Sequence, residues 1–158
     1  FFYGINFYFQ YKGFDLTMFW QGIQGRDIIS DLKKETDLWS GLNIGFLNKG
    51  RRVLDAWTPN NPDSDIPALT RSDLNNEKRV STYYVEDGSF LKLRNIQIGY
   101  NVPEQALQKI KMRKLRVYVS AQNLLTIKSR TFTGVDPENP NYGYPIPMNL
   151  TFGVNIGF

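Results

Sequence analysis

Apolar and polar side chains alternate with a period of two along most of the chain. Over residues 1–11 the odd positions are aromatic or aliphatic, and the even positions from Gly4 onward are mostly polar. Similar alternation runs through four later segments. Because successive side chains of a β-strand point to opposite faces, the pattern predicts five strands, each with one apolar and one polar face. The expected strands are at about 1–12, 14–22, 89–102, 114–127 and 148–158.

Two local features refine these strands. Lys12 and Gly13 separate the first two runs and predict a tight hairpin turn. The apolar phase of the third strand changes between Leu93 and Ile96, which predicts a β-bulge near Arg94. All eight prolines lie outside the expected strands, as the hydrogen bonding of a sheet requires.

The connections between the strands are alternately short and long. Residues 23–88 and 128–147 form the long ones, whereas compact soluble domains seldom contain unstructured loops of that length. Transmembrane β-barrels have short turns on one side of the membrane and long loops on the other. The expected strands also exceed the ~5–6 residues usual in soluble sheets and match the ~9–11 of a tilted membrane strand.

Aromatic residues occur at the strand ends beside the short turns, where they predict a girdle at the membrane–water interface. They are Tyr11, Phe14, Tyr100 and Phe158. The pattern therefore favours an all-β fold, an antiparallel transmembrane β-barrel segment with long loops. A soluble β-sandwich, a glycan-binding module with long loops, is the alternative, since its strands also alternate.

Five strands cannot close a barrel, and two open edges in lipid are not viable. We therefore expect the chain to be one arc of a larger barrel and a piece of a longer polypeptide. In this register the lipid-facing side chains include Ile5, Phe7, Phe9, Leu16, Met18, Ile96, Ile98, Val117, Val119, Val154 and Ile156. The lumen-facing ones include Asn6, Gln10, Thr17, Gln97, Gly99, Ser120, Gln122, Thr151 and Asn155.

Composition removes several classes of function. The chain has no cysteine and no histidine, which excludes disulfides, thiolate or imidazole metal sites, and Ser-His-Asp or Cys-His catalysis. The close carboxylates of residues 63–65 and 136–138 lie in turns rich in Pro and Asn, where Asp caps the backbone. We expect no enzyme activity, no cofactor and no metal. The net charge of +4 is too small to indicate nucleic acid, and the cations of residues 109–116 predict a solvated rim on a short turn.

Several ordered motifs resemble one family, the SusC/RagA-type TonB-linked outer-membrane proteins. Residues 83–103, YYVEDGSFLKLRNIQIGYNVP, resemble the family's dGSFlrLrNitlGYxlP stretch, and residues 115–124, LRVYVSAQNL, resemble its next strand. WTPNNP at 57–62 resembles a loop that precedes them. GVDPE at 134–138, Tyr144-Pro145 and a last strand ending in Phe158 follow in the family's order.

The resemblance implies that this segment is the last five strands of a barrel of about 22 strands whose plug domain lies outside this chain. It implies a nutrient importer of the bacterial outer membrane that takes up oligosaccharides or oligopeptides. Its partners would be TonB, outer-membrane lipid and a SusD-like surface lipoprotein, but no nucleic acid. The loops at 23–88 and 128–147 would be extracellular.

The long loops supply the candidate contacts. Exposed aromatics can stack on a ligand and arginines can bind carboxylates, and the alternative is that they pack the loop on itself. The candidates for contact with substrate or partner are Trp39, Trp57, Tyr83, Tyr84, Arg51 and Arg52. Phe158 is the candidate barrel-assembly signal, because a terminal aromatic would fix the depth of a closing strand at the interface.

Overall fold

The computed structural model describes residues 1–38, 48–70, 76–108, 111–140 and 143–158. These residues form two compact units. The first contains Phe1–Arg26, Ser89–Lys128 and Ile146–Phe158, and the second contains Asp27–Gly88 and Ser129–Pro145. None of the helices in the described ranges has the length and apolar character needed to cross a membrane.

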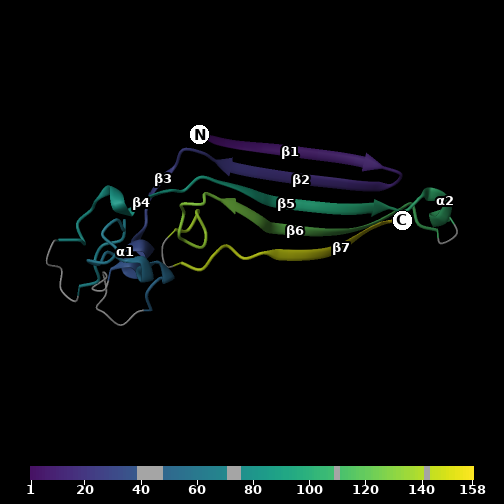
Figure 1. Ribbon diagram of the computed structural model, residues 1–158. Helices are drawn as coiled ribbons and strands as arrows, with labels where there is room; N and C mark the ends of the chain where they lie inside the picture. Colours follow the sequence, from purple (N-terminus) through teal and green to yellow (C-terminus); the bar gives the residue numbers. More distant parts are fainter. Residues whose placement is uncertain (39–47, 71–75, 109–110, 141–142) are drawn as a thin grey trace. The chain divides into compact units, whose positions relative to one another are not determined.

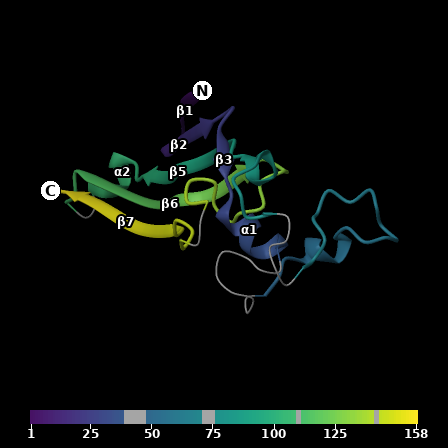
Figure 2. The same cartoon turned by 90° about the vertical axis from the view of Figure 1, so that its left-hand side faces the viewer.

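The first unit is a single antiparallel sheet of five long strands in the order β1-β2-β5-β6-β7 (Figure 1). The strands are β1 (Phe2–Tyr11), β2 (Phe14–Ile23), β5 (Phe90–Asn101), β6 (Lys114–Lys128) and β7 (Asn149–Gly157). A short helix, α2 (Glu104–Leu107), lies in the connection between β5 and β6. β7 is visibly curved in Figure 2, as expected for a strand of a twisted sheet. The all-β, antiparallel fold predicted from the alternation is confirmed.

The turn between β1 and β2 has the predicted geometry. Lys12 and Gly13 both have positive φ, 46° and 88°, as the primed two-residue hairpin turns require. Gly13 is also close to the next hairpin, since a Cβ on it would come within 2.9 Å of the Asn101 carbonyl oxygen. Glycine is therefore required there for conformation and for space.

The predicted bulge is present in β5. Phe19 and Trp20 of β2 pair with Asn95 and Leu93, so Arg94 is an extra residue in β5. On its other side Arg94 lies opposite two residues of β6, Asn123 and Leu124. Asn123 has a φ of +53°, so the irregularity involves both strands. The bulge resets the alternation and keeps the apolar side chains of both halves of β5 on one face.

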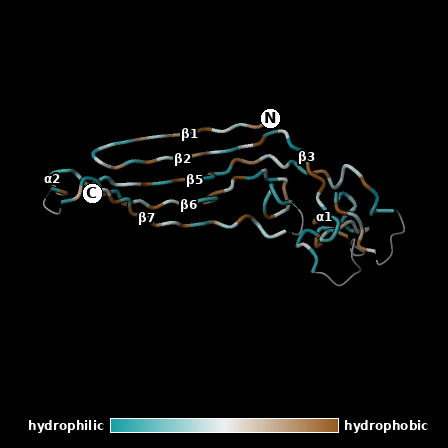
Figure 3. The backbone as a smooth tube through the Cα atoms, turned by 180° about the vertical axis from the view of Figure 1, so that it is seen from behind, coloured by the Kyte–Doolittle hydropathy of each residue, from teal (hydrophilic) through white to brown (hydrophobic). Residues whose placement is uncertain are grey.

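The pairing places apolar residues on one face and polar residues on the other. Rows of paired residues on the apolar face are Phe7–Met18–Ile96–Ala121–Leu150, Phe9–Leu16–Ile98–Val119–Phe152 and Tyr11–Phe14–Tyr100–Val117–Val154. Rows on the polar face are Tyr8–Thr17–Gln97–Ser120–Thr151 and Gln10–Asp15–Gly99–Tyr118–Gly153. The two kinds alternate along the strands in Figure 3. The apolar face is exposed, with Phe152 at 80%, so it is suited to lipid rather than to water.

The second unit contains short elements where the sequence predicted loops. They are β3 (Asp27–Ile29), paired with β4 (Val85–Asp87), a helix α1 (Asp31–Asp37), and the 3-10 helices η1 (Arg51–Asp55) and η2 (Thr82–Tyr84). Ser30 caps α1, its Oγ accepting from the Lys33 N–H at 3.1 Å. A helix of seven residues is too short to show a clear apolar period, which is why the pattern did not predict it.

The core of the second unit joins distant parts of the chain. Its buried apolar side chains are Ile28, Leu38, Ala56, Ile66, Tyr84 and Phe132. Thr133 attaches the 129–145 segment to β4, donating from its backbone N and its Oγ1 to the Glu86 carboxylate at 3.2 and 2.7 Å. The two long connections between strands are therefore one packed body.

Candidate functional site

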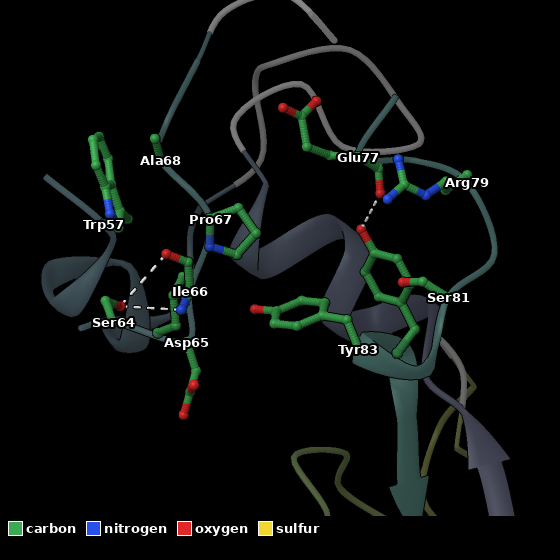
Figure 4. Close-up of a pocket in the computed structure, with 11 residues that line it drawn as sticks. Trp57, Ser64, Asp65, Ile66, Pro67, Ala68, Glu77, Arg79, Ser81 and Tyr83 are labelled. Atoms are coloured by element: carbon green, nitrogen blue, oxygen red, sulfur yellow. Dashed lines mark hydrogen bonds between the residues drawn. The ribbon is translucent and has the colours of Figure 1, made fainter. Parts of the chain in front are cut away.

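A cleft of about 510 Å³ opens in the second unit. Three of the predicted aromatic contacts line it, Trp57, Tyr83 and Tyr84, and Ile66 and Pro67 are drawn between Trp57 and Tyr83 (Figure 4). Asp65, Glu77 and Arg79 add charged groups of both signs. The cleft therefore offers aromatic surfaces together with groups that can form hydrogen bonds and ion pairs.

Trp57 is held by a short loop that folds back after η1. The Trp57 N–H donates to the Ile66 carbonyl at 2.8 Å, and the Asn61 Nδ2 donates to the Asp55 Oδ1 at 3.0 Å. Ser64 Oγ donates to the Asp55 carbonyl as well. Trp57 remains 42% exposed although its backbone is fixed, so part of the residue is accessible to a ligand.

Tyr83 and Tyr84 have different roles although they are neighbours in the sequence. Their rings pack edge to face with centroids 5.1 Å apart. Tyr84 is 1% exposed, and its hydroxyl donates to the Glu77 carbonyl at 2.5 Å, so it is part of the core and holds one wall of the cleft. We expect Tyr83 rather than Tyr84 to contact a ligand.

A buried carboxylate orients Tyr83. The Tyr83 hydroxyl donates to the Asp37 Oδ2 at 2.8 Å, and the Arg52 Nη1 lies 3.0 Å from the same oxygen. Asp37 is fully buried, so its charge needs both partners. Both predicted arginines are exposed, and Arg52 in addition forms this ion pair while its side chain stays 40% accessible.

Burial changes the ionisation of two groups beside Asp37. It lowers the pKa of Lys33, and the nearby Arg52 lowers it further. The Lys33 Nζ donates to the Tyr83 carbonyl at 2.5 Å and lies 4.1 Å from the Tyr83 ring centroid. Burial also raises the pKa of Tyr83 above its ordinary value of 10.0, and the hydrogen bond to Asp37 raises it further. The Tyr83 hydroxyl therefore remains a donor at neutral pH.

This arrangement predicts an alkaline loss of stability that depends on Tyr83. A raised pKa contributes stability that is fully present below pH 10 and is lost as the pH rises toward the folded value. Tyr83→Phe should abolish this pH dependence and cost about 2 kcal/mol at pH 7, because Asp37 loses a donor. The measurement is limited proteolysis of the second unit in the whole protein between pH 7 and 11. Tyr144→Phe, at a side chain that is 96% exposed, is the control. Unchanged alkaline sensitivity in Tyr83→Phe would contradict the assignment.

The remaining predicted residues lie elsewhere. Trp39 is outside the described residues. Phe158 follows β7 at the end of the sheet near the β5–β6 connection and is 82% exposed, and its role in assembly stays a prediction. Within the described ranges, no group of three or more Asp or Glu residues could hold a metal ion.

An ion pair that the sequence pattern did not predict lies on the polar face of the sheet. Arg116 belongs to the basic run of residues 109–116, yet it pairs with Asp15. The Arg116 Nη2 lies 2.5 Å from the Asp15 Oδ1, and the Arg116 Nε lies 3.0 Å from the Asp15 Oδ2. Asn101 Nδ2 donates to the same Oδ2 at 3.0 Å. Arg116 crosses β5 over Gly99, where a Cβ would collide with the guanidinium. Only the polar-face position of these residues was readable from the sequence.

Comparisons with known proteins agree on one family. No family model matches the chain. Two relatives from Formosa agariphila, TonB-dependent receptors P3 and P26, are 34% and 31% identical over 98% and 94% of this chain. The chain spans 16% of the length of each.

Solved structures give the same result. A structure of the RagAB peptide transporter matches 94% of this chain with 31% identity and a TM-score of 0.76. The RagAB peptide importer in its open-open state matches 98% with 29% identity and a TM-score of 0.79. The chain covers 16% and 17% of those two chains. The β-sandwich alternative is not favoured, since these structures match nearly the whole chain.

Proposed function

Because this chain is a segment of a SusC/RagA-like TonB-dependent outer-membrane transporter, we propose that the whole protein imports oligopeptides across the outer membrane with energy delivered through TonB. A SusD-like surface lipoprotein is its partner outside the cell. The chain itself has no catalytic role in this proposal, which agrees with relatives named as receptors and transporters.

The cleft of the second unit is the observation that carries the assignment of a substrate site. Trp57 and Tyr83 present aromatic surfaces to it, and Asp65, Glu77 and Arg79 line it with charges of both signs. Peptides carry apolar side chains and charged groups of both signs, so a cleft of this mixed character fits them. The RagAB neighbours, described as peptide transporters and importers, support the same class.

Oligosaccharides are the second class of substrate. The exposure of Trp57, 42%, favours them because a sugar ring can stack on an indole. Competition between a mixed oligopeptide pool and an oligosaccharide pool for the same labelled ligand distinguishes the two classes.

Binding of labelled oligopeptides to the whole transporter with its lipoprotein partner tests the site. We expect Trp57→Ala to weaken binding about 5-fold or more, because truncating an aromatic hot-spot residue at the centre of an interface costs over about 1 kcal/mol. Tyr83→Ala should have a similar effect, whereas Tyr83→Phe keeps the ring and should retain most of the affinity. Tyr144→Ala, at an exposed aromatic of the same unit, is the matched control.

The outcome depends on intact folding of the second unit. Each variant is therefore checked by its protease resistance and by the presence of the lipoprotein in the purified complex. Wild-type affinity in a folded Trp57→Ala protein would overturn the assignment of this cleft as the substrate site.

A further inference from the structure

A second cleft, of about 490 Å³, lies at the end of the five-stranded sheet where the β1–β2 turn approaches the β5–β6 connection. Three cations line it, Lys12, Arg113 and Lys114, against one carboxylate, Glu104. The rim therefore carries a clear excess of positive charge. It belongs to the first unit alone and is separate from the aromatic cleft described above.

The surrounding backbone holds this cleft in a defined shape. Leu107 of α2 is 2% exposed and anchors the connection against the sheet. The Val102 N–H donates to the Leu115 carbonyl at 2.9 Å, and the Arg113 N–H donates to the Gly157 carbonyl at 2.9 Å. The cations therefore project from fixed backbone positions and not from a loose loop.

The carboxylates of the described residues do not neutralise these cations. In the ranges that the structure describes, Lys12, Arg113 and Lys114 form no ion pair, and all three are exposed. Arg116, two residues beyond Lys114, is by contrast paired with Asp15. Within the basic run, Arg116 therefore stabilises the sheet, whereas Arg113 and Lys114 are available to an anion from solution or from the membrane.

The aromatic residues beside the cleft place it at the level of lipid headgroups. Tyr11, Phe14 and Tyr100 end their strands on the apolar face, and the rings of Phe14 and Tyr100 lie 4.6 Å apart. The Lys12 Nζ lies 5.2 Å from the Tyr11 ring centroid, at the edge of this group. Aromatic side chains collect at the membrane–water interface, and lysines and arginines near it attract anionic lipids.

We propose that this cleft binds the phosphate headgroup of an anionic membrane phospholipid. The Arg113 guanidinium supplies a planar fork suited to two phosphate oxygens, and the two lysines supply compact positive charges. Tyr11, Phe14 and Tyr100 lie at the same end of the sheet, at the depth where lipid phosphates lie, which favours a lipid over a free anion. This site is independent of the substrate and of the import function proposed above.

Native mass spectrometry of the whole transporter in a mild detergent tests this proposal. The probes are phosphatidylglycerol and phosphatidylcholine with identical acyl chains. We expect wild-type protein to retain phosphatidylglycerol preferentially, and each of Lys12→Gln, Arg113→Gln and Lys114→Gln to reduce that preference about fivefold. Arg130→Gln removes an exposed cation of the second unit and should leave the preference unchanged.

The possible results separate the proposal from its alternatives. Equal retention of the two lipids overturns it, and so does an unchanged preference in the triple variant that combines Lys12→Gln, Arg113→Gln and Lys114→Gln. Inorganic phosphate that binds as tightly as phosphatidylglycerol would show a simple anion site and would also overturn it. Heat-modifiable migration shows that the triple variant is folded, and its peptide binding should remain at the wild-type level whichever lipid result is obtained.

Discussion

Arginine in place of Val119 should abolish assembly of the barrel, whereas arginine in place of its neighbour Ser120 should be tolerated. Val119 lies on the apolar face between Ile98 and Phe152, in the middle part of β6. A charged side chain facing lipid near the midplane costs about 2–4 kcal/mol. Ser120 points to the opposite face, where the environment is polar, so the same charge there has little effect.

Heat-modifiable migration of the whole protein in outer-membrane fractions measures this difference. We expect the folded band to be lost in Val119→Arg and retained in Ser120→Arg. Val119→Leu is the control, since it changes size but keeps an apolar side chain. Equal tolerance of the two arginines would show that this face does not contact lipid.

The ion pair between Asp15 and Arg116 should lock three strands of the sheet together. It joins residues 101 apart in the sequence, from β2 to β6, across Gly99 of β5. The two side chains are only 9% and 15% exposed, so a carboxylate or guanidinium left alone would be poorly solvated. We expect Asp15→Ala to destabilise the protein by about 2 kcal/mol, the usual cost of a lost hydrogen bond to a charged group.

Gly99→Ala provides a sharper test of the same feature. The new Cβ occupies the path of the guanidinium and should force Arg116 away from Asp15. Because the Arg116 side chain is flexible, it can move away from the new Cβ with little strain. The loss of unfolding free energy should therefore come from the broken ion pair. Gly99→Ala should therefore destabilise wild-type protein by about 2 kcal/mol and an Arg116→Met protein by much less.

The midpoint of heat-induced unfolding of the purified transporter measures each of these variants. Asp15→Asn is the conservative control, because it keeps a hydrogen-bond acceptor and loses the charge. Additive effects of Gly99→Ala and Arg116→Met would contradict a shared role for the two positions.

The sequence was most informative about the sheet. Strand pleating imposes a period of two on side-chain direction, so the alternation through Phe7, Phe9 and Val119 was enough to assign faces. The turn at Lys12-Gly13 and the bulge at Arg94 were also readable, because each is a local departure from that period. These features depend on residues close together in the sequence.

In the second unit the roles of the candidate residues depend on tertiary contacts. The sequence predicts the unit's aromatic and arginine residues as candidates for contact with substrate or partner, but it does not distinguish their roles. Both tyrosines line the cleft, but Tyr84 is buried and Tyr83 is only partly buried; both arginines are exposed, and Arg52 is paired with Asp37. Neighbouring residues of one type differ here because each meets a different part of the fold, and α1 supplies the carboxylate.

The sequence by itself determined the strands, their two faces and the family that the motifs resemble. Only the tertiary structure decided that Trp57 and Tyr83 share a cleft, that Arg116 reaches Asp15 over Gly99, and that Lys12 lies with Arg113 beside one groove. Side-chain periodicity is a local property of the backbone. Contacts between distant residues depend on strand order and register, which no single segment of the sequence contains.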